Sequence, residues 1–86
     1  MVKIDLYTSN ACSRCVDAKQ RVRAAVDTLS STGEQFELHF IDVVEHIDRA
    51  VALGILATPA IVIEGELIFS TLPTDKKLQT ELAKYL

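Results

Sequence analysis

The sequence has few cysteines, no long apolar segment and no excess of positive charge. Each of these absences excludes a class of protein. Two cysteines in 86 residues are too few for a disulfide-rich secreted scaffold. A net charge of −3 leaves no basic surface for nucleic acid or for an anionic membrane. The longest apolar run, residues 50–57, is far shorter than the ~20 residues of a membrane span.

The apolar content of the chain, in contrast, is high. Hydrophobic residues make up 49% of the sequence, which predicts a packed core, and the length fits one domain over residues 1–86. The N-terminal residues alternate charge with hydrophobicity and contain no apolar segment of signal-peptide length. We therefore expect a soluble protein of the cytoplasm, where two closely spaced cysteines are more often redox-active or metal-binding than structural.

Hydrophobic periodicity predicts the element order β-α-β-α-β-β-α. A long helix joins the first two strands, which must therefore be parallel, whereas the last two strands are close enough only for an antiparallel hairpin. The sequence thus predicts an α/β fold with a four-stranded mixed sheet and helices on both faces. The expected strands are residues 3–7, 36–41, 60–63 and 66–70, and the expected helices begin near residues 12, 44 and 74.

Apolar residues at helical and strand spacing predict which side chains form the core. The first helix ends at the weak helix formers of residues 30–33, and Thr74 is placed to cap the last helix. Phenylalanines at strand positions are expected to be core residues as well. The expected buried positions are Cys15, Ala18, Val22, Ala25, Val26 and Leu29 in the first helix, Ile47, Ala50 and Val51 in the second, Leu78, Leu82 and Leu86 in the third, and Phe36, Phe40 and Phe69 in strands.

The cysteines form a C-x-x-C motif, Cys12 to Cys15, at the junction of the first strand and the first helix. A helix N-terminus stabilises a thiolate and lowers a cysteine pKa from about 8.5 to between about 3.5 and 7.5 in such motifs. Arg14 adds positive charge between the two sulfurs. Cys12 is less embedded and is expected to attack a target disulfide, and Cys15, on the buried stripe, is expected to resolve the mixed disulfide.

Two other interpretations of the cysteine pair are open. A structural zinc site needs two more ligands, and only His39 and His46 are available, with a separation outside the usual His spacing. A redox-inert pair of buried cysteines is the second alternative. The strand-to-helix position inside a β-α-β unit favours the redox interpretation, and we expect neither a metal nor another cofactor.

The C-x-x-C after the first strand, the element order and Pro59 at the start of the third strand together resemble the thioredoxin-like superfamily. The similarity spans residues 3–86 and is greatest to the small thioredoxins of archaea and some bacteria. It implies that Cys12 attacks and Cys15 resolves, and that Pro59 is a cis-proline packed against them. It also implies that the Thr58 backbone binds an extended segment of a target protein. We expect Ala11 and Arg14 to belong to the same target-binding surface, which Ala11 forms together with Thr58 and Pro59.

The sequence departs from this family pattern at several positions. Ser13 and Arg14 separate the cysteines, so no reduction potential follows by analogy, and Leu6 stands where ordinary thioredoxins bury an aspartate. The glutathione-binding segment of glutaredoxins is absent from residues 70–75 except for Asp75. We therefore expect protein disulfides rather than glutathione as substrate.

The resemblance also implies partners. The expected partners are disulfide-containing proteins and an NADPH- or ferredoxin-linked thioredoxin reductase. The protein itself is expected to be a monomer that binds neither nucleic acid nor membrane. Three alternatives stay open: a glutaredoxin-like reductase that uses glutathione, a non-catalytic binding module of the same fold, and an iron–sulfur cluster held between two chains through Cys12.

Overall fold

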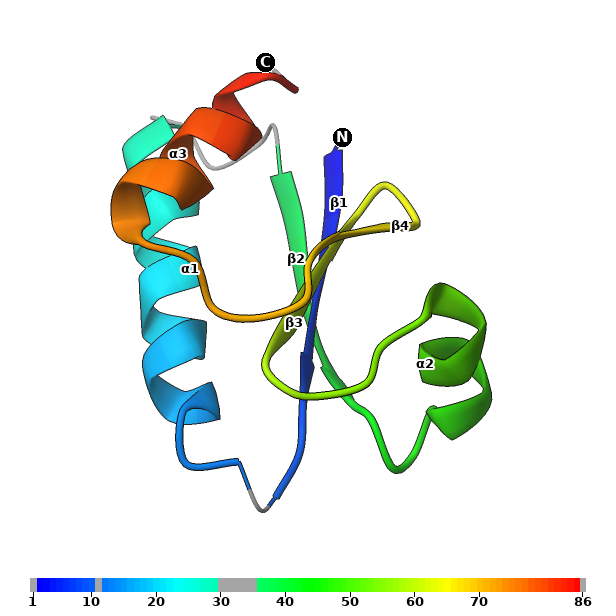
Figure 1. The fold of residues 1–86 in the computed structure, drawn as a ribbon. Helices are drawn as coiled ribbons and strands as arrows, with labels where there is room; N and C mark the ends of the chain where they lie inside the picture. Colours follow the sequence, from blue (N-terminus) through cyan, green and yellow to red (C-terminus); the bar gives the residue numbers. More distant parts are fainter. Residues whose placement is uncertain (1, 11, 30–35, 86) are drawn as a thin grey trace.

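A computed structural model of the chain describes residues 2–10, 12–29 and 36–85, and its element order is the predicted one (Figure 1). Within these ranges no helix has both the length and the apolar character required to cross a membrane. The elements are β1 (Val2–Thr8), α1 (Cys15–Leu29), β2 (Phe36–Asp42), α2 (Ile47–Leu53), β3 (Ala60–Ile63), β4 (Glu66–Phe69) and α3 (Asp75–Ala83).

The four strands form one mixed sheet in the order β2-β1-β3-β4. β1 and β2 are parallel, as the long helical connection requires, and β3 is antiparallel to both β1 and β4. Glu64 and Gly65 make the turn of the β3–β4 hairpin with φ angles of 52° and 79°. Two positive φ angles in a two-residue turn match the twist of the flanking strands, so the predicted hairpin is confirmed.

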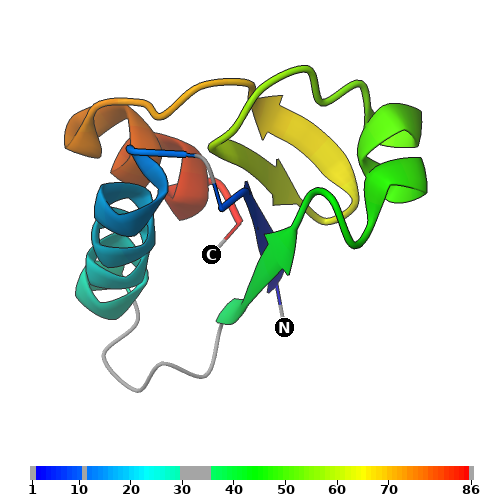
Figure 2. The ribbon, with the colours of Figure 1, turned by 90° about the horizontal axis from the view of Figure 1, so that it is seen from below.

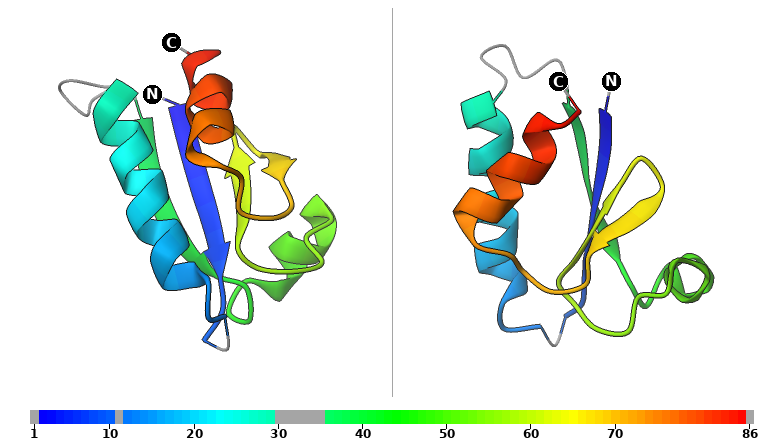
Figure 3. Two further views of the ribbon diagram at one scale, coloured as in Figure 1. Left: turned by 60° about the vertical axis from the view of Figure 1, so that its left-hand side comes forward. Right: turned by 45° about the horizontal axis from the view of Figure 1, so that its top comes forward.

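The helices α1 and α3 cover one face of the sheet, and α2 covers the other (Figures 2 and 3). The α1 stripe is buried as predicted, with Leu29 partly buried at its end. The predicted helix end at residues 30–33 lies outside the described residues. The core on this face consists of Ile4, Leu6, Ala18, Val22, Ala25, Val26, Phe36, Ile61, Ile63, Leu78 and Leu82.

The last helix begins where its cap was predicted. Thr74 has extended backbone angles, and its Oγ1 accepts a hydrogen bond of 3.2 Å from the backbone N–H of Lys77. Leu78 and Leu82 point into the core and are almost fully buried, as expected. Leu86, the third expected member of that stripe, lies outside the described residues.

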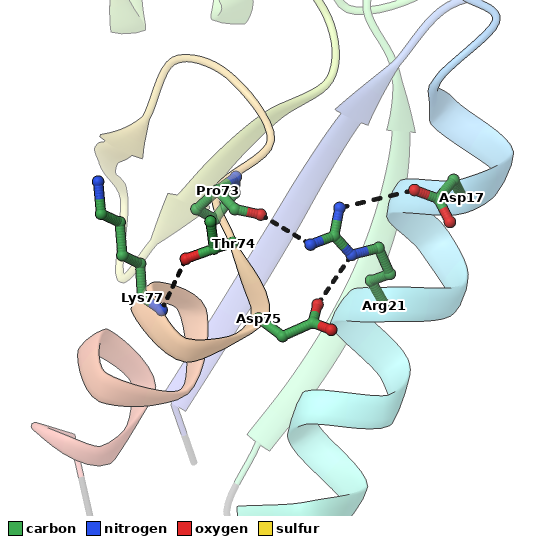
Figure 4. Close-up of polar contacts among 6 residues, drawn as sticks. All are labelled: Asp17, Arg21, Pro73, Thr74, Asp75 and Lys77. Atoms are coloured by element: carbon green, nitrogen blue, oxygen red, sulfur yellow. Dashed lines mark hydrogen bonds and ion pairs between the residues drawn. The ribbon is translucent and has the colours of Figure 1, made fainter.

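A single arginine connects α1 to the start of α3 (Figure 4). Arg21 Nε donates to Asp75 Oδ1 at 2.8 Å, and its Nη2 donates to the carbonyl oxygen of Pro73 at 3.1 Å. Its Nη1 lies 3.6 Å from Asp17 Oδ2 on the preceding helical turn. The hydrogen bond to Asp75 raises the pKa of the Arg21 guanidinium, so this group stays charged at any ordinary pH.

The opposite face of the sheet has a smaller core because α2 spans only seven residues. The helix ends at Gly54, as predicted, in the left-handed conformation that glycine favours. The prediction that Ile47 and Val51 point inward is wrong: their exposed fractions are 53% and 69%. Only Ala50 of this short helix is buried, and Leu53 is partly buried at its end. This core consists of Tyr7, Ile41, Ala50, Ile55, Ala60 and Val62.

The edge strand β2 accounts for another wrong prediction. Phe36 is buried and Phe69 is partly buried against the larger core, but Phe40 is 38% exposed. The cationic groups of Lys19 and Arg23 each lie 5.4 Å from the centre of the Phe40 ring. An aromatic face at a sheet edge is thus covered by two cations instead of by the core.

Candidate functional site

The chain passes from β1 into α1 through two tight turns that contain the cysteine pair. The Cys12 backbone N–H donates to the Ser9 carbonyl oxygen at 3.2 Å, and the Cys15 N–H donates to the Cys12 carbonyl oxygen at 3.4 Å. The Arg14 carbonyl oxygen accepts the bond of 2.9 Å from the Ala18 N–H. The helix therefore begins at Cys15, three residues later than the periodicity predicted, and Cys12 lies in the turn before it.

The two cysteines are joined by a disulfide, with their Cα atoms 5.4 Å apart. Cys15 is only 4% exposed and lies on the buried side of α1, whereas Cys12 is partly exposed. Both sulfurs belong to the helix start, where backbone N–H groups lack intrahelical partners. Cys12 is thus partly accessible while Cys15 is shielded, an asymmetry that suits dithiol exchange.

The loop between α2 and β3 supplies a second part of the site. The Thr58–Pro59 peptide bond is cis, Pro59 is buried, and Thr58 is partly exposed. Ser9 Oγ and Thr58 Oγ1 are 3.1 Å apart, a hydrogen bond between residues separated by 49 positions. The fold therefore brings the Thr58–Pro59 loop beside the loop that leads to Cys12, at the same end of the sheet (Figure 1).

Exposed groups next to these two loops complete the surroundings. Val16, directly after Cys15, is largely exposed, and Leu56 is 98% exposed in the loop before Pro59. The expected site residue Arg14 is exposed on the same turn as the cysteines, whereas the expected site residue Ala11 lies outside the described residues. One exposed apolar side chain thus lies in each of the two segments that carry Cys15 and Pro59.

The environment of a buried acid is a feature that the sequence did not indicate. Leu6 is fully buried in the larger core, and the neighbouring Asp5 faces α2, where it is 4% exposed. Its Oδ2 lies 3.7 Å from Arg49 Nη2, and its Oδ1 has no hydrogen-bond partner within the described part of the chain. Asp5 is on the sheet face opposite to α1, so it is no substitute for a proton acceptor packed against Cys15.

The histidines of the zinc alternative are not gathered around the cysteines. His39 Nε2 lies 3.3 Å from Glu37 Oε1 on the edge strand, and His46 is exposed at the start of α2. In residues 2–10, 12–29 and 36–85, no three His, Cys, Asp or Glu side chains are placed so that they hold one metal ion.

Sequence comparison supports the interpretation of this geometry. A family model described as a thioredoxin domain matches residues 2–83. A thioredoxin of Methanocaldococcus jannaschii is 35% identical over 85 residues, which is 99% of this chain and 96% of the relative. A probable thioredoxin of Methanothermobacter marburgensis is 28% identical and covers 91% of this chain and 88% of its own length.

Solved structures agree with the sequence relatives. A mutant thioredoxin from Halobacterium salinarum superposes with a TM-score of 0.68 at 26% identity, over 98% of this chain and 74% of the other. The disulfide at the start of a helix and the match over nearly the whole chain lead to one conclusion. The chain belongs to the thioredoxin family.

Proposed function

We propose that the protein is a cytoplasmic thiol–disulfide oxidoreductase of the thioredoxin type, which reduces protein disulfides by dithiol exchange through Cys12 and Cys15. The observation that carries the proposal is the disulfide between a partly exposed Cys12 and a buried Cys15 at the start of α1. Membership of the thioredoxin family supports a redox function of this general kind.

The reaction has two exchange steps. In the reduced protein the Cys12 thiolate attacks one sulfur of the target disulfide, a mixed disulfide forms, and the second target sulfur leaves as a thiolate that takes a proton from water. Cys15 then gives up its proton to solvent, and its thiolate attacks Cys12 Sγ, which forms the Cys12–Cys15 disulfide and releases the first target sulfur as a thiolate that takes a proton from solvent. The target gains two electrons and two protons. The helix start and the positive charge of Arg14 favour the thiolate form of Cys12.

Target binding uses the surface around the disulfide. An extended target segment pairs with the Thr58 backbone as a short added strand beside Pro59 and Arg14, with Ala11 expected to contact the same segment. Exposed Val16 and Leu56 offer apolar contacts next to that segment. A thioredoxin reductase linked to NADPH or ferredoxin returns two electrons to the disulfide of this protein, which acts as a monomer.

Serine substitutions at the two cysteines test which of them attacks the target and which resolves the mixed disulfide. With dithiothreitol as electron donor, the wild type is expected to reduce insulin, and Cys12→Ser is expected to lose this activity because no attacking sulfur remains. Mixed with insulin in the absence of dithiothreitol, the reduced Cys15→Ser variant should accumulate a mixed disulfide with the target, visible as a mass increase that added dithiothreitol removes. Insulin reduction that persists in Cys12→Ser would contradict the assignment of the attacking cysteine.

The glutaredoxin-like alternative finds less support in the structure. Asp75, the remaining residue of the glutathione-binding pattern, accepts a hydrogen bond from Arg21 and joins α3 to α1 (Figure 4). Reduction of the protein by glutathione alone would nevertheless favour this alternative. The binding-module alternative predicts that a variant with serine at both cysteines keeps its biological function. The iron–sulfur alternative predicts that the purified protein is coloured.

A further inference from the structure

Ser9 connects the two loops of the proposed site by two different groups. Its carbonyl oxygen accepts a hydrogen bond of 3.2 Å from the Cys12 backbone N–H. Its side-chain Oγ lies 3.1 Å from Thr58 Oγ1, in a partly buried contact. One residue thus holds the turn that leads to the attacking sulfur and the loop that precedes Pro59.

We propose that Ser9 is a positioning residue that sets the spacing between Cys12 and the Thr58 backbone, and thereby selects protein disulfides over small disulfides. This inference rests on the proposed function. A protein target has to reach both points at once: its sulfur at Cys12 and its extended backbone at Thr58. A small disulfide needs to reach only Cys12.

The physical basis is preorganisation. When both loops are already held at the spacing that the bound target requires, binding does not have to order them, and less of the interaction free energy is lost. Without the hydroxyl pair the loops keep their own backbone structure, but their mutual position is held less firmly. The loss therefore falls on the binding of substrates that contact both loops.

The test is a double-mutant cycle on insulin reduction with Ser9→Ala, Thr58→Val and the combined variant. Each single substitution removes one hydroxyl and is expected to raise KM for insulin about threefold to tenfold, the effect of losing one neutral hydrogen bond. The double variant is expected to show no further increase, since both substitutions remove the same bond. The kcat for insulin in Ser9→Ala should stay within about twofold of the wild type.

A small aromatic disulfide, dithiobis(nitrobenzoate), is the second substrate. We expect Ser9→Ala to reduce it with a kcat/KM within about twofold of the wild type, because this substrate does not extend to Thr58. Ser9→Thr keeps a hydroxyl and is expected to restore the wild-type KM for insulin. A merely structural role of Ser9 would change the rates with both substrates together.

Thr28→Val is the matched control. This substitution also removes a hydroxyl hydrogen bond, which Thr28 Oγ1 donates to the Ala24 carbonyl oxygen at 2.9 Å. Thr28 lies thirteen residues after Cys15 on α1, about 20 Å away along the helix. Its KM for insulin should equal that of the wild type.

The outcomes separate the two proposals. A wild type that fails to reduce insulin would overturn both the proposed function and this inference. An active wild type overturns the inference alone if Ser9→Ala leaves KM unchanged, if the two substitutions are additive, or if the small disulfide is affected as strongly as insulin.

Discussion

The two faces of the sheet differ in how they are covered. Under α1 and α3 lies a continuous apolar core, whereas under α2 the core is smaller and contains buried polar atoms. The Asp5 Oδ1 and the Tyr7 hydroxyl are such atoms, and neither has a hydrogen-bond partner within the residues that the structure describes. We infer that the first face supplies most of the stability. The second face is used to place the loop of Thr58 and Pro59 beside the cysteines.

The largest expected difference between the faces is the effect of truncating one apolar side chain on each. Leu82 in α3 is fully buried, so Leu82→Ala should lower the free energy of unfolding by about 2–5 kcal/mol. Ile47 in α2 is mostly exposed, so Ile47→Ala should change it by less than about 0.5 kcal/mol. Urea denaturation of both variants measures the difference. Similar losses in the two variants would contradict the inference that the first face supplies most of the stability.

Reduction of the disulfide is expected to have a smaller effect. The bond closes a loop of only four residues, for which the loss of chain entropy in the unfolded state corresponds to about 2 kcal/mol. The reduced protein should therefore stay folded on the core beneath α1 and α3, with a free energy of unfolding lower by about 2 kcal/mol or less. Circular dichroism during urea denaturation with and without dithiothreitol measures this. Unfolding on reduction alone would show that the cysteines are structural.

The smallest effect is expected at the buried acid beneath α2. Asp5→Val replaces a buried carboxylate by an apolar, β-branched side chain and should raise the free energy of unfolding by about 1 kcal/mol. Arg49→Met leaves the carboxylate without its cation and should lower the same free energy by about 1 kcal/mol, a value reduced by the half-exposed position of the arginine. Thermal unfolding of the two variants tests the opposite signs. A loss of stability in Asp5→Val would show that the acid stabilises this face.

The sequence predicted the elements better than it predicted their burial. Periodicity identified every helix and strand, because the spacing of apolar residues is a local property of the chain. Burial depends on what covers a residue, and the sequence does not show that Ile47 and Val51 lie on the exposed side of α2 or that Phe40 lies on an edge strand. Asp5 is buried because it lies on a central strand whose face carries α2, although aspartate is usually exposed.

The candidate site likewise has features that the sequence predicted and a feature that it did not. The spacing and position of Cys12 and Cys15 were visible as a local pattern, and Pro59 was included through the resemblance to a family. No pattern predicted the hydrogen bond between Ser9 and Thr58, because two hydroxyls far apart in a sequence carry no sign of contact. Such a contact is determined by the fold as a whole.

This separation of 49 residues has a consequence for the order in which the protein acquires its properties during synthesis. The segment with both cysteines leaves the ribosome well before the loop that holds Thr58 and Pro59, since synthesis proceeds from the N-terminus. The nascent chain therefore has both cysteines before it has the Thr58–Pro59 loop that we propose binds the target. The proposed selectivity is therefore the later property, because it requires β3 to pair with β1 and complete the sheet.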